Sequence, residues 1–117
     1  MIALGLMSGT SCDGVDAIAI ELVHPAVPGE PRVLGHAFRP YPADVRRDLL
    51  DPERLTVPRL SELHFALAEL YADTARDLDV TSAEVCGMHG QTLWHDPPSR
   101  AGKRVPSTLQ IGSSALL

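Results

Sequence analysis

The sequence predicts an α/β fold in which an antiparallel meander of three strands precedes helices and further strands. Two observations carry this prediction. Apolar, β-branched stretches joined by short polar connections occupy the first 40 positions, and a long segment with leucines three and four residues apart follows them. The length of 117 residues fits one domain or less, and 44% hydrophobic with 21% charged residues is the usual composition of a globular protein.

The first three strands are expected at residues 2–7, 15–23 and 33–38. The connection between the first two is too short to hold a crossover helix, so these strands should be antiparallel neighbours. Residues 25–31 contain three prolines and a glycine, and they should form a turn before the third strand. These segments make up the predicted meander.

Two helices should follow the meander. The shorter covers 43–50 and ends before Pro52, and the longer covers 58–78, where Pro58 suits the first helical turn. One face of the longer helix is apolar and should pack on the core: Leu60, Leu63, Leu67, Leu70, Thr74 and Leu78.

Short strands at 84–88 and 108–111 complete the predicted order β-β-β-α-α-β-β. The Gly-Ser-Ser group at 112–114, followed by Ala-Leu-Leu, is typical of a helix cap and first turn. A single turn is not stable alone, so we expect a longer protein to continue from this point.

Charge and hydropathy exclude several classes of partner. The net charge of −5 opposes a broad nucleic-acid surface, which needs clustered lysine and arginine. No apolar segment approaches the roughly 20 residues of a membrane span, and no signal peptide is visible. We therefore expect a cytoplasmic protein without nucleic-acid or membrane partners, with Cys12 and Cys86 as reduced thiols. His24, His36 and His64 should be structural or surface residues.

Eight small or polar residues, 7–14, separate the first two predicted strands. Gly9 and Gly14 can adopt positive φ and let a ligand approach the backbone. A tight turn here directs several N–H groups inward as an anion-binding nest. Hydroxyl groups stand beside them on Ser8, Thr10 and Ser11. Asp13 and Asp16 can hold a magnesium ion, directly or through water.

Together these groups suit the phosphates and the metal of a nucleoside triphosphate. An ordinary polar hairpin turn accounts for the same composition and stays open as the alternative. The segment is not a P-loop, since it lacks Gly-x-x-x-x-Gly-Lys-Ser/Thr. It is not a nucleophile elbow either, because Ser11 lacks glycines at both −2 and +2.

A second polar group follows the strand predicted at 84–88, where ligand sites of α/β sheets tend to lie. Its side chains suit the paired donors and acceptors of a sugar, and its members are His89, Gly90, Gln91 and Thr92. Trp94 can cover an apolar sugar face, although a place in the core is the alternative. Cys86 and His89 lack a familiar second ligand pair, so we expect no zinc site and a buried Cys86.

These motifs resemble those of a known family. Residues 5–11 (Gly-Leu-Met-Ser-Gly-Thr-Ser), followed by Asp-Gly-Val-Asp at 13–16, closely resemble the N-terminal signature of the anhydro-N-acetylmuramic acid kinases. His-Gly-Gln-Thr at 89–92 resembles the second family motif, and Thr-Leu-Gln-Ile-Gly at 108–112 resembles the third. Three motifs in the family's order make the resemblance specific, and it covers essentially the whole chain.

The resemblance implies a fold and a reaction. Residues 1–117 would form the N-terminal portion of the first domain of an actin-like ATPase (ribonuclease H-like) fold, with the rest of that domain and the second domain outside the chain. Family members use ATP to open 1,6-anhydro-N-acetylmuramic acid by hydrolysis and to phosphorylate its 6-oxygen. The product, N-acetylmuramic acid 6-phosphate, belongs to the recycling of cell-wall sugars. A homodimer is a candidate assembly for the full-length protein.

The resemblance also implies residue roles. The ATP phosphates, with Mg²⁺, would bind the stretch Gly9, Thr10, Ser11, Cys12, Asp13, Gly14, Val15 and Asp16. Cys12 occupies a position that varies in the family, so its thiol should not be catalytic. The stretch His89, Gly90, Gln91 and Thr92 should lie near the sugar, with Thr92 the best candidate for direct contact.

The family's catalytic base is an aspartate in a later Asp-Phe-Arg-type motif, which we expect beyond Leu117. The chain should therefore contain no catalytic residue and be inactive alone. Two other functions stay open: an ATP-binding actin-like module without sugar kinase chemistry, and a truncated, non-functional product. The sugar-facing group at 89–92 favours the kinase, because an actin-like or chaperone-like protein has no need of it.

Overall fold

The structure is a computed structural model that describes residues 1–23, 29–80, 82–102 and 105–117. Its strands are β1 (Ile2–Met7), β2 (Gly14–Glu21), β3 (Arg32–Pro40), β4 (Val85–Met88), β5 (Gln91–Asp96) and β6 (Ser107–Ile111). Its helices are α1 (Ala43–Leu50), η1 (Pro52–Arg54), α2 (Val57–Arg76), α3 (Pro98–Ala101) and η2 (Ser114–Leu116), where η marks a 3-10 helix. The fold is therefore of the mixed α/β class that the sequence predicts.

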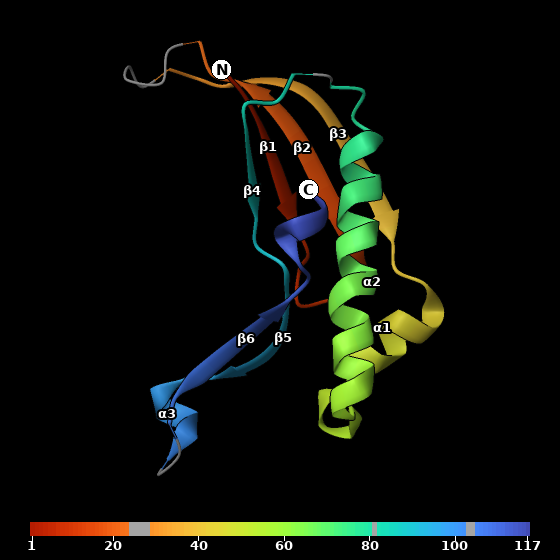
Figure 1. Cartoon of the computed structure of the whole chain (residues 1–117). Helices are drawn as coiled ribbons and strands as arrows, with labels where there is room; N and C mark the ends of the chain where they lie inside the picture. The colour runs from red at the N-terminus through yellow and green to blue at the C-terminus, as the bar shows by residue number, and fades with distance from the viewer. Residues whose placement is uncertain (24–28, 81, 103–104) are drawn as a thin grey trace.

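A four-stranded sheet in the order β3-β2-β1-β4 forms the body of the molecule. Figure 1 shows α2 lying along this sheet, while the hairpin of β5 and β6 projects away from it with α3 near its tip. The predicted meander is confirmed, since β2 pairs antiparallel with both β1 and β3. β4 then pairs parallel with β1 after the crossover through α1 and α2.

The strand ends differ slightly from the prediction. β2 stops at Glu21, whereas β3 extends to Pro40, which is paired with Gly14. A proline is tolerated there because β3 is an edge strand, where a missing N–H removes no ladder bond on the open side. The predicted strands at 84–88 and 108–111 are confirmed as β4 and β6. The sequence pattern does not predict the strand β5, because the polar residues at its start indicate a binding motif.

The predicted long helix is confirmed as α2. Thr56 caps its start, with its hydroxyl accepting from the Arg59 N–H at 3.4 Å. Leu63, Leu67 and Tyr71 are fully buried on the sheet side. Of the predicted apolar face, Leu60 and Leu70 are only partly buried.

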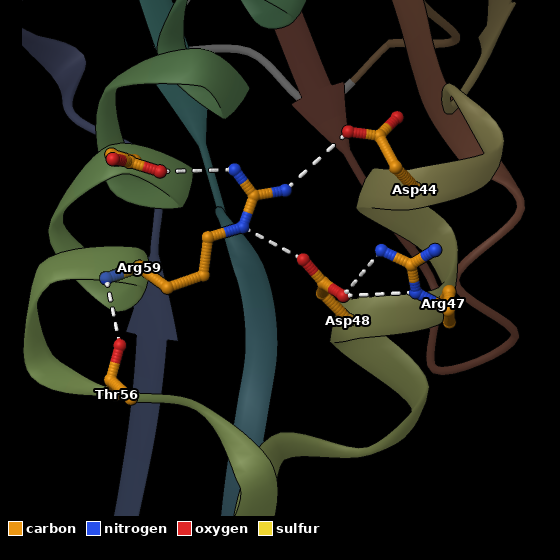
Figure 2. A network of polar contacts seen from close by, with 6 residues as sticks. Asp44, Arg47, Asp48, Thr56 and Arg59 are labelled. Carbon is orange, nitrogen blue, oxygen red and sulfur yellow. Dashed lines mark hydrogen bonds and ion pairs between the residues drawn. The ribbon is translucent and has the colours of Figure 1, made fainter.

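Arg59 joins the start of α2 to α1. Its guanidinium donates to Asp48 at 2.7 Å, to Glu62 at 3.1 Å and to Asp44 at 3.5 Å. Figure 2 shows the contacts with Asp48 and Asp44. The hydrogen bond from Arg59 is the main cause that lowers the pKa of Asp48. This charge-assisted hydrogen bond joins the short helix to the long one.

The two faces of the large sheet are unlike. One face packs against α2 through Leu6, Val15, Ala17 and Ala19, which are all buried. The opposite face, here called the open face, carries exposed apolar side chains: Met7, Ile18, Phe38 and Val85. A shallow groove of about 620 Å³ runs over it and reaches Asp16, His36 and His89.

The final residues form one 3-10 turn, in agreement with the predicted cap and first turn. The Ser113 hydroxyl accepts from the Ala115 N–H at 3.2 Å. None of the helices within the described ranges is long and apolar enough to cross a membrane.

Candidate functional site

The turn between β1 and β2 is closed by a hydrogen bond to the Gly9 carbonyl. It accepts from the Cys12 N–H at 3.2 Å, and Cys12 itself has φ 51° in the left-handed region. The Ser11 hydroxyl donates to Asp13 at 2.8 Å, and this bond is the largest cause that lowers the pKa of the Asp13 carboxyl. The side chains of Thr10, Ser11 and Asp13 are exposed. Within the part of the chain that the structure describes, no group accepts from the Thr10 or Ser11 N–H.

The expectation of positive φ at Gly9 and Gly14 is wrong. The described glycines with positive φ are Gly90, Gly102 and Gly112. Gly14 is needed for a different reason: an added Cβ would collide with the Arg39 carbonyl and lie 2.7 Å from the Phe38 ring. A Cβ on Gly9 would meet only the Ser11 side chain, at 3.5 Å, and Ser11 N, at 4.0 Å. The turn thus leaves open space beside Gly9 and close packing at Gly14.

Residues 14–16 are the first residues of β2. Successive side chains of a strand point to opposite faces of the sheet, so these residues do not share one surface. Val15 is fully buried against α2, and Gly14 is buried beside β3, opposite Pro40. Asp16 points to the open face, where its carboxylate lies 3.0 Å from His36 Nε2. The structure therefore brings Thr10, Ser11 and Asp13 to the surface of the turn, while Cys12, Gly14 and Val15 support it from within.

The second motif begins where β4 ends. The His89 N–H donates to the Leu6 carbonyl at 3.1 Å, which holds the ends of the parallel strands β1 and β4 side by side. Gly90 has φ 76°, and an added Cβ would lie 2.8 Å from the Ile111 carbonyl oxygen, so only glycine fits there. His89 is exposed and Thr92 is half-buried.

Gln91 is fully buried, with both amide hydrogens donated to main-chain carbonyls. Its Nε2 bonds to the Gly9 carbonyl at 3.1 Å and to the Thr92 carbonyl at 3.1 Å. The first of these bonds joins the second motif directly to the turn of the first motif, 82 positions away.

Two tyrosines extend this contact into the core. Tyr41 donates to Gln91 Oε1 at 3.1 Å, Ser8 and Tyr41 are 2.6 Å apart, and Tyr71 donates to Ser8 at 2.6 Å. All four side chains are buried, and burial raises the pKa of both tyrosines, so the phenols stay protonated at neutral pH. We call the residues Tyr71, Ser8, Tyr41 and Gln91 the buried chain. The sequence signal for it was slight: Tyr71 follows Leu67 by four on the apolar face of α2.

The third motif lies beside the second. β6 pairs antiparallel with β5, with Ile111 opposite Gln91. Gly112 donates its N–H to His64 Nδ1 at 3.1 Å, and the Ser113 N–H donates to the His64 carbonyl. His64 therefore has the structural role that was expected, as a link between α2 and the third motif. Of the other two histidines, His36 is exposed and His24 lies outside the described residues.

The structure thus brings three separate sequence motifs together at the end of the sheet where β1 and β4 terminate. A family model described as anhydro-N-acetylmuramic acid kinase matches residues 1–117. The chain belongs to the anhydro-N-acetylmuramic acid kinase family.

Curated members of the anhydro-N-acetylmuramic acid kinase family match nearly all of the chain. A relative from Parasynechococcus marenigrum is 43% identical over 85% of the chain and 27% of its own length. One from Synechococcus sp. (strain CC9311) is 41% identical over 97% of the chain and 30% of its own length. One from Caldanaerobacter subterraneus is 33% identical over 99% of the chain and 32% of its own length. The chain therefore spans less than a third of these curated kinases.

A cavity of about 380 Å³ lies beside β5. It is lined by Glu53, Trp94, His95, Asp96 and Arg100. Trp94 is half-buried. Its burial is therefore intermediate between the two predicted places, the core and an accessible face that could cover a sugar. Lys103 and Arg104, which form a basic stretch with Arg100 in the sequence, lie outside the described residues.

The cysteines are free thiols, as expected, but their burial differs from the prediction. Cys12 is buried, and burial raises the pKa of its thiol. Cys86 was expected to be buried and is exposed, because its strand β4 is at the edge of the sheet with no described strand beyond it. The described ranges contain no group of three or more His, Cys, Asp or Glu side chains that could hold a metal ion.

Proposed function

We propose that residues 1–117 form the part of an anhydro-N-acetylmuramic acid kinase that binds the phosphates of ATP and one side of the sugar. The observation that carries this proposal is the 3.1 Å hydrogen bond from Gln91 to the Gly9 carbonyl. It brings the hydroxyl-rich turn and the second motif together at the carboxyl ends of the parallel strands β1 and β4, the edge at which open α/β sheets bind ligands. The same arrangement supports our proposal that residues 1–117 form the N-terminal portion of the first actin-like domain.

The turn supplies the phosphate contacts in this proposal. Consecutive N–H groups at a turn bind anions without basic side chains. Thr10 and Ser11 offer such groups at the surface, together with their hydroxyls. Gly9 leaves the space through which a phosphate oxygen can approach, and Cys12, Gly14 and Val15 hold the turn in shape.

The carboxylates of Asp13 and Asp16 fit a magnesium ion bound with the phosphates. Mg²⁺ takes one or two carboxylates in addition to phosphate oxygens and water, so a larger acidic cluster is not required. Both carboxylates are exposed, Asp13 on the turn and Asp16 on the open face near the start of β2. When bound, the ion neutralises phosphate charge.

The second motif supplies the sugar side. His89 and Thr92 present an imidazole and a hydroxyl, whereas Gly90 and Gln91 give the segment its shape. In the cavity beside β5, Trp94 can stack on an apolar sugar face, and the Arg100 guanidinium can attract the lactyl carboxylate.

The reaction proposed for the whole protein is the hydrolytic opening of 1,6-anhydro-N-acetylmuramic acid with transfer of the ATP γ-phosphate to the 6-oxygen. We assign no general base to residues 1–117, and we place the aspartate that activates water in a later segment of the protein. The setting is cytoplasmic recycling of cell-wall sugars.

Substitutions at Gly9 test the phosphate role in the native-length protein. A Cβ at Gly9 has room in the ligand-free turn, so Gly9→Ala and Gly9→Val should leave the melting temperature nearly unchanged. They should raise the KM for ATP progressively, because the side chain occupies the phosphate approach, and leave the KM for the sugar unchanged. Gly35→Ala, in β3, adds a methyl group in ordinary contact with Leu78 and serves as control. Unchanged ATP affinity in Gly9→Val would overturn the proposal.

A further inference from the structure

The buried chain has a defined direction. Main-chain carbonyls only accept, so the Gln91 amide nitrogen must face Gly9 and Thr92, and its oxygen must face Tyr41. An amide oxygen also only accepts, so the Tyr41 hydroxyl donates to Gln91. The Ser8 hydroxyl then donates to Tyr41, and Tyr71 donates to Ser8. Each hydroxyl hydrogen of the buried chain is therefore donated in a hydrogen bond. The last acceptor of the buried chain is the Gly9 carbonyl.

This end point sets the orientation of one peptide group. In a trans peptide the carbonyl and the following N–H point in opposite directions, and the described chain contains no cis peptide bond. The Gly9 carbonyl points inward, where Gln91 and the Cys12 N–H both donate to it. The Thr10 N–H must therefore point outward, to the exposed surface of the turn.

Packing alone does not explain these side chains. Phenylalanine would fill the volume of Tyr71 or Tyr41 without burying a hydroxyl, and buried polar groups are costly unless they are all hydrogen-bonded. The four members come from four separate places: α2, the residue after β1, the residue after β3, and β5. A fully satisfied network of this kind holds one arrangement of its parts. Here the part it holds at the surface is the turn.

We propose that Tyr71, Tyr41 and Gln91 are positioning residues that hold the Gly9–Thr10 peptide with its N–H outward, as a donor to a phosphate of the bound nucleotide. This inference rests on the proposed function, and it adds that residues of the core, without contact to ligand, set the affinity of the turn for phosphate.

The test compares single substitutions in the native-length protein. Gln91→Leu removes the bond to Gly9, Tyr41→Phe acts one bond further away, and Tyr71→Phe acts at the far end. Thr74→Val is the matched control. It removes a buried hydroxyl from the same side of α2, where Thr74 bonds only to the Leu70 carbonyl at 2.6 Å.

We expect the KM for ATP to rise about tenfold in Gln91→Leu, which is the effect of losing one charge-assisted hydrogen bond. Tyr41→Phe and Tyr71→Phe should give progressively smaller rises, with the KM for the sugar unchanged. Thr74→Val should leave the KM for ATP unchanged even where it lowers the melting temperature as much as Tyr71→Phe does. A purely structural role would instead make the KM changes follow the losses in stability.

Backbone NMR without ligand separates this inference from the proposed function. The Gly9 carbonyl and Thr10 amide resonances should move in Tyr41→Phe and Tyr71→Phe and stay in place in Thr74→Val. If the wild-type protein binds no ATP, the proposed function fails. The Gly9 and Thr10 resonances alone then decide whether the buried chain orients the Gly9–Thr10 peptide group. Unmoved Gly9 and Thr10 resonances in both tyrosine variants, or an unchanged KM for ATP in both, would overturn the inference.

Discussion

Two glycines of the same turn differ in what their missing side chain allows. At Gly14, the backbone of β3 approaches so closely that no Cβ fits, and the need is for space within the protein. At Gly9, the space is open to the outside, and the need we propose is for a ligand. The sequence shows both as glycine and cannot separate these reasons, because the distinction depends on what packs against each position.

This difference predicts unequal effects on stability. Gly14→Ala should lower the free energy of unfolding by about 3 kcal/mol, since the methyl group would force β3 away from β2. Gly9→Ala should change it by less than about 0.5 kcal/mol. Chemical denaturation of both variants measures the two values, and a similar loss in both would contradict the structure at this turn.

At the scale of elements, the helix α2 stabilises the sheet through a few fully buried side chains. The leucine spacing predicted this face correctly at Leu63 and Leu67. It did not include Tyr71, which is equally buried, because the predicted face followed the recurring leucines and Thr74. The hydroxyl partner, Ser8, is 63 positions away and is identified only by the fold.

The burial pattern of α2 predicts a clear contrast between two neighbouring positions. Leu67→Ala should reduce the free energy of unfolding by about 2–5 kcal/mol through the cavity that it leaves in the core. Phe65→Ala removes a larger side chain, but one that is 54% exposed, so it should cost less than Leu67→Ala. Equal losses in urea unfolding would show that α2 packs by a different face.

The junction of α1 and α2 predicts a pH dependence of stability. Arg59 holds the pKa of Asp48 below its ordinary value of 3.8. A depressed carboxyl pKa stabilises the folded state above the ordinary pKa, and this contribution is lost as the pH falls through the lower, folded value. The melting temperature of the wild type should therefore exceed that of Asp48→Asn at neutral pH, and the two should converge in acid.

Thermal unfolding from about pH 6 to about pH 2.5 checks this convergence. Asp44→Asn is the control, because its contact with Arg59 is longer, at 3.5 Å, and the carboxylate is 59% exposed. It should show a smaller difference at every pH. A constant gap between wild type and Asp48→Asn down to the lowest pH would contradict the assigned ion pair.

At the scale of the whole molecule, the large sheet is covered on one face and open on the other. The open face carries exposed Met7, Ile18, Phe38 and Val85, and among the described residues no strand pairs with the outer side of β3 or β4. Exposed apolar faces and sheet edges promote association. The curated relatives are more than three times as long as the matched part, so further polypeptide is present in those proteins.

We therefore predict that the isolated 117-residue chain self-associates, unfolds over a broad temperature range and shows no turnover in a coupled ATP/ADP assay with the anhydro sugar. Ile18→Thr should reduce the association, because it makes the centre of the open face polar. Val57→Thr changes an exposed residue away from that face and should have no effect. A monomeric chain with a sharp transition would contradict the first part, and turnover would contradict the second.

The sequence by itself determined the order of the main elements, the meander, the buried face of α2 and the family. Each of these depends on local spacing or on motifs that lie within a few residues. Only the tertiary structure decided that Gln91 bonds to Gly9, that two tyrosines and a serine extend this bond into the core, and that Gly14 rather than Gly9 is required by packing. These contacts join residues far apart in the chain, and hydrogen bonds of such range follow from the fold and not from local pattern.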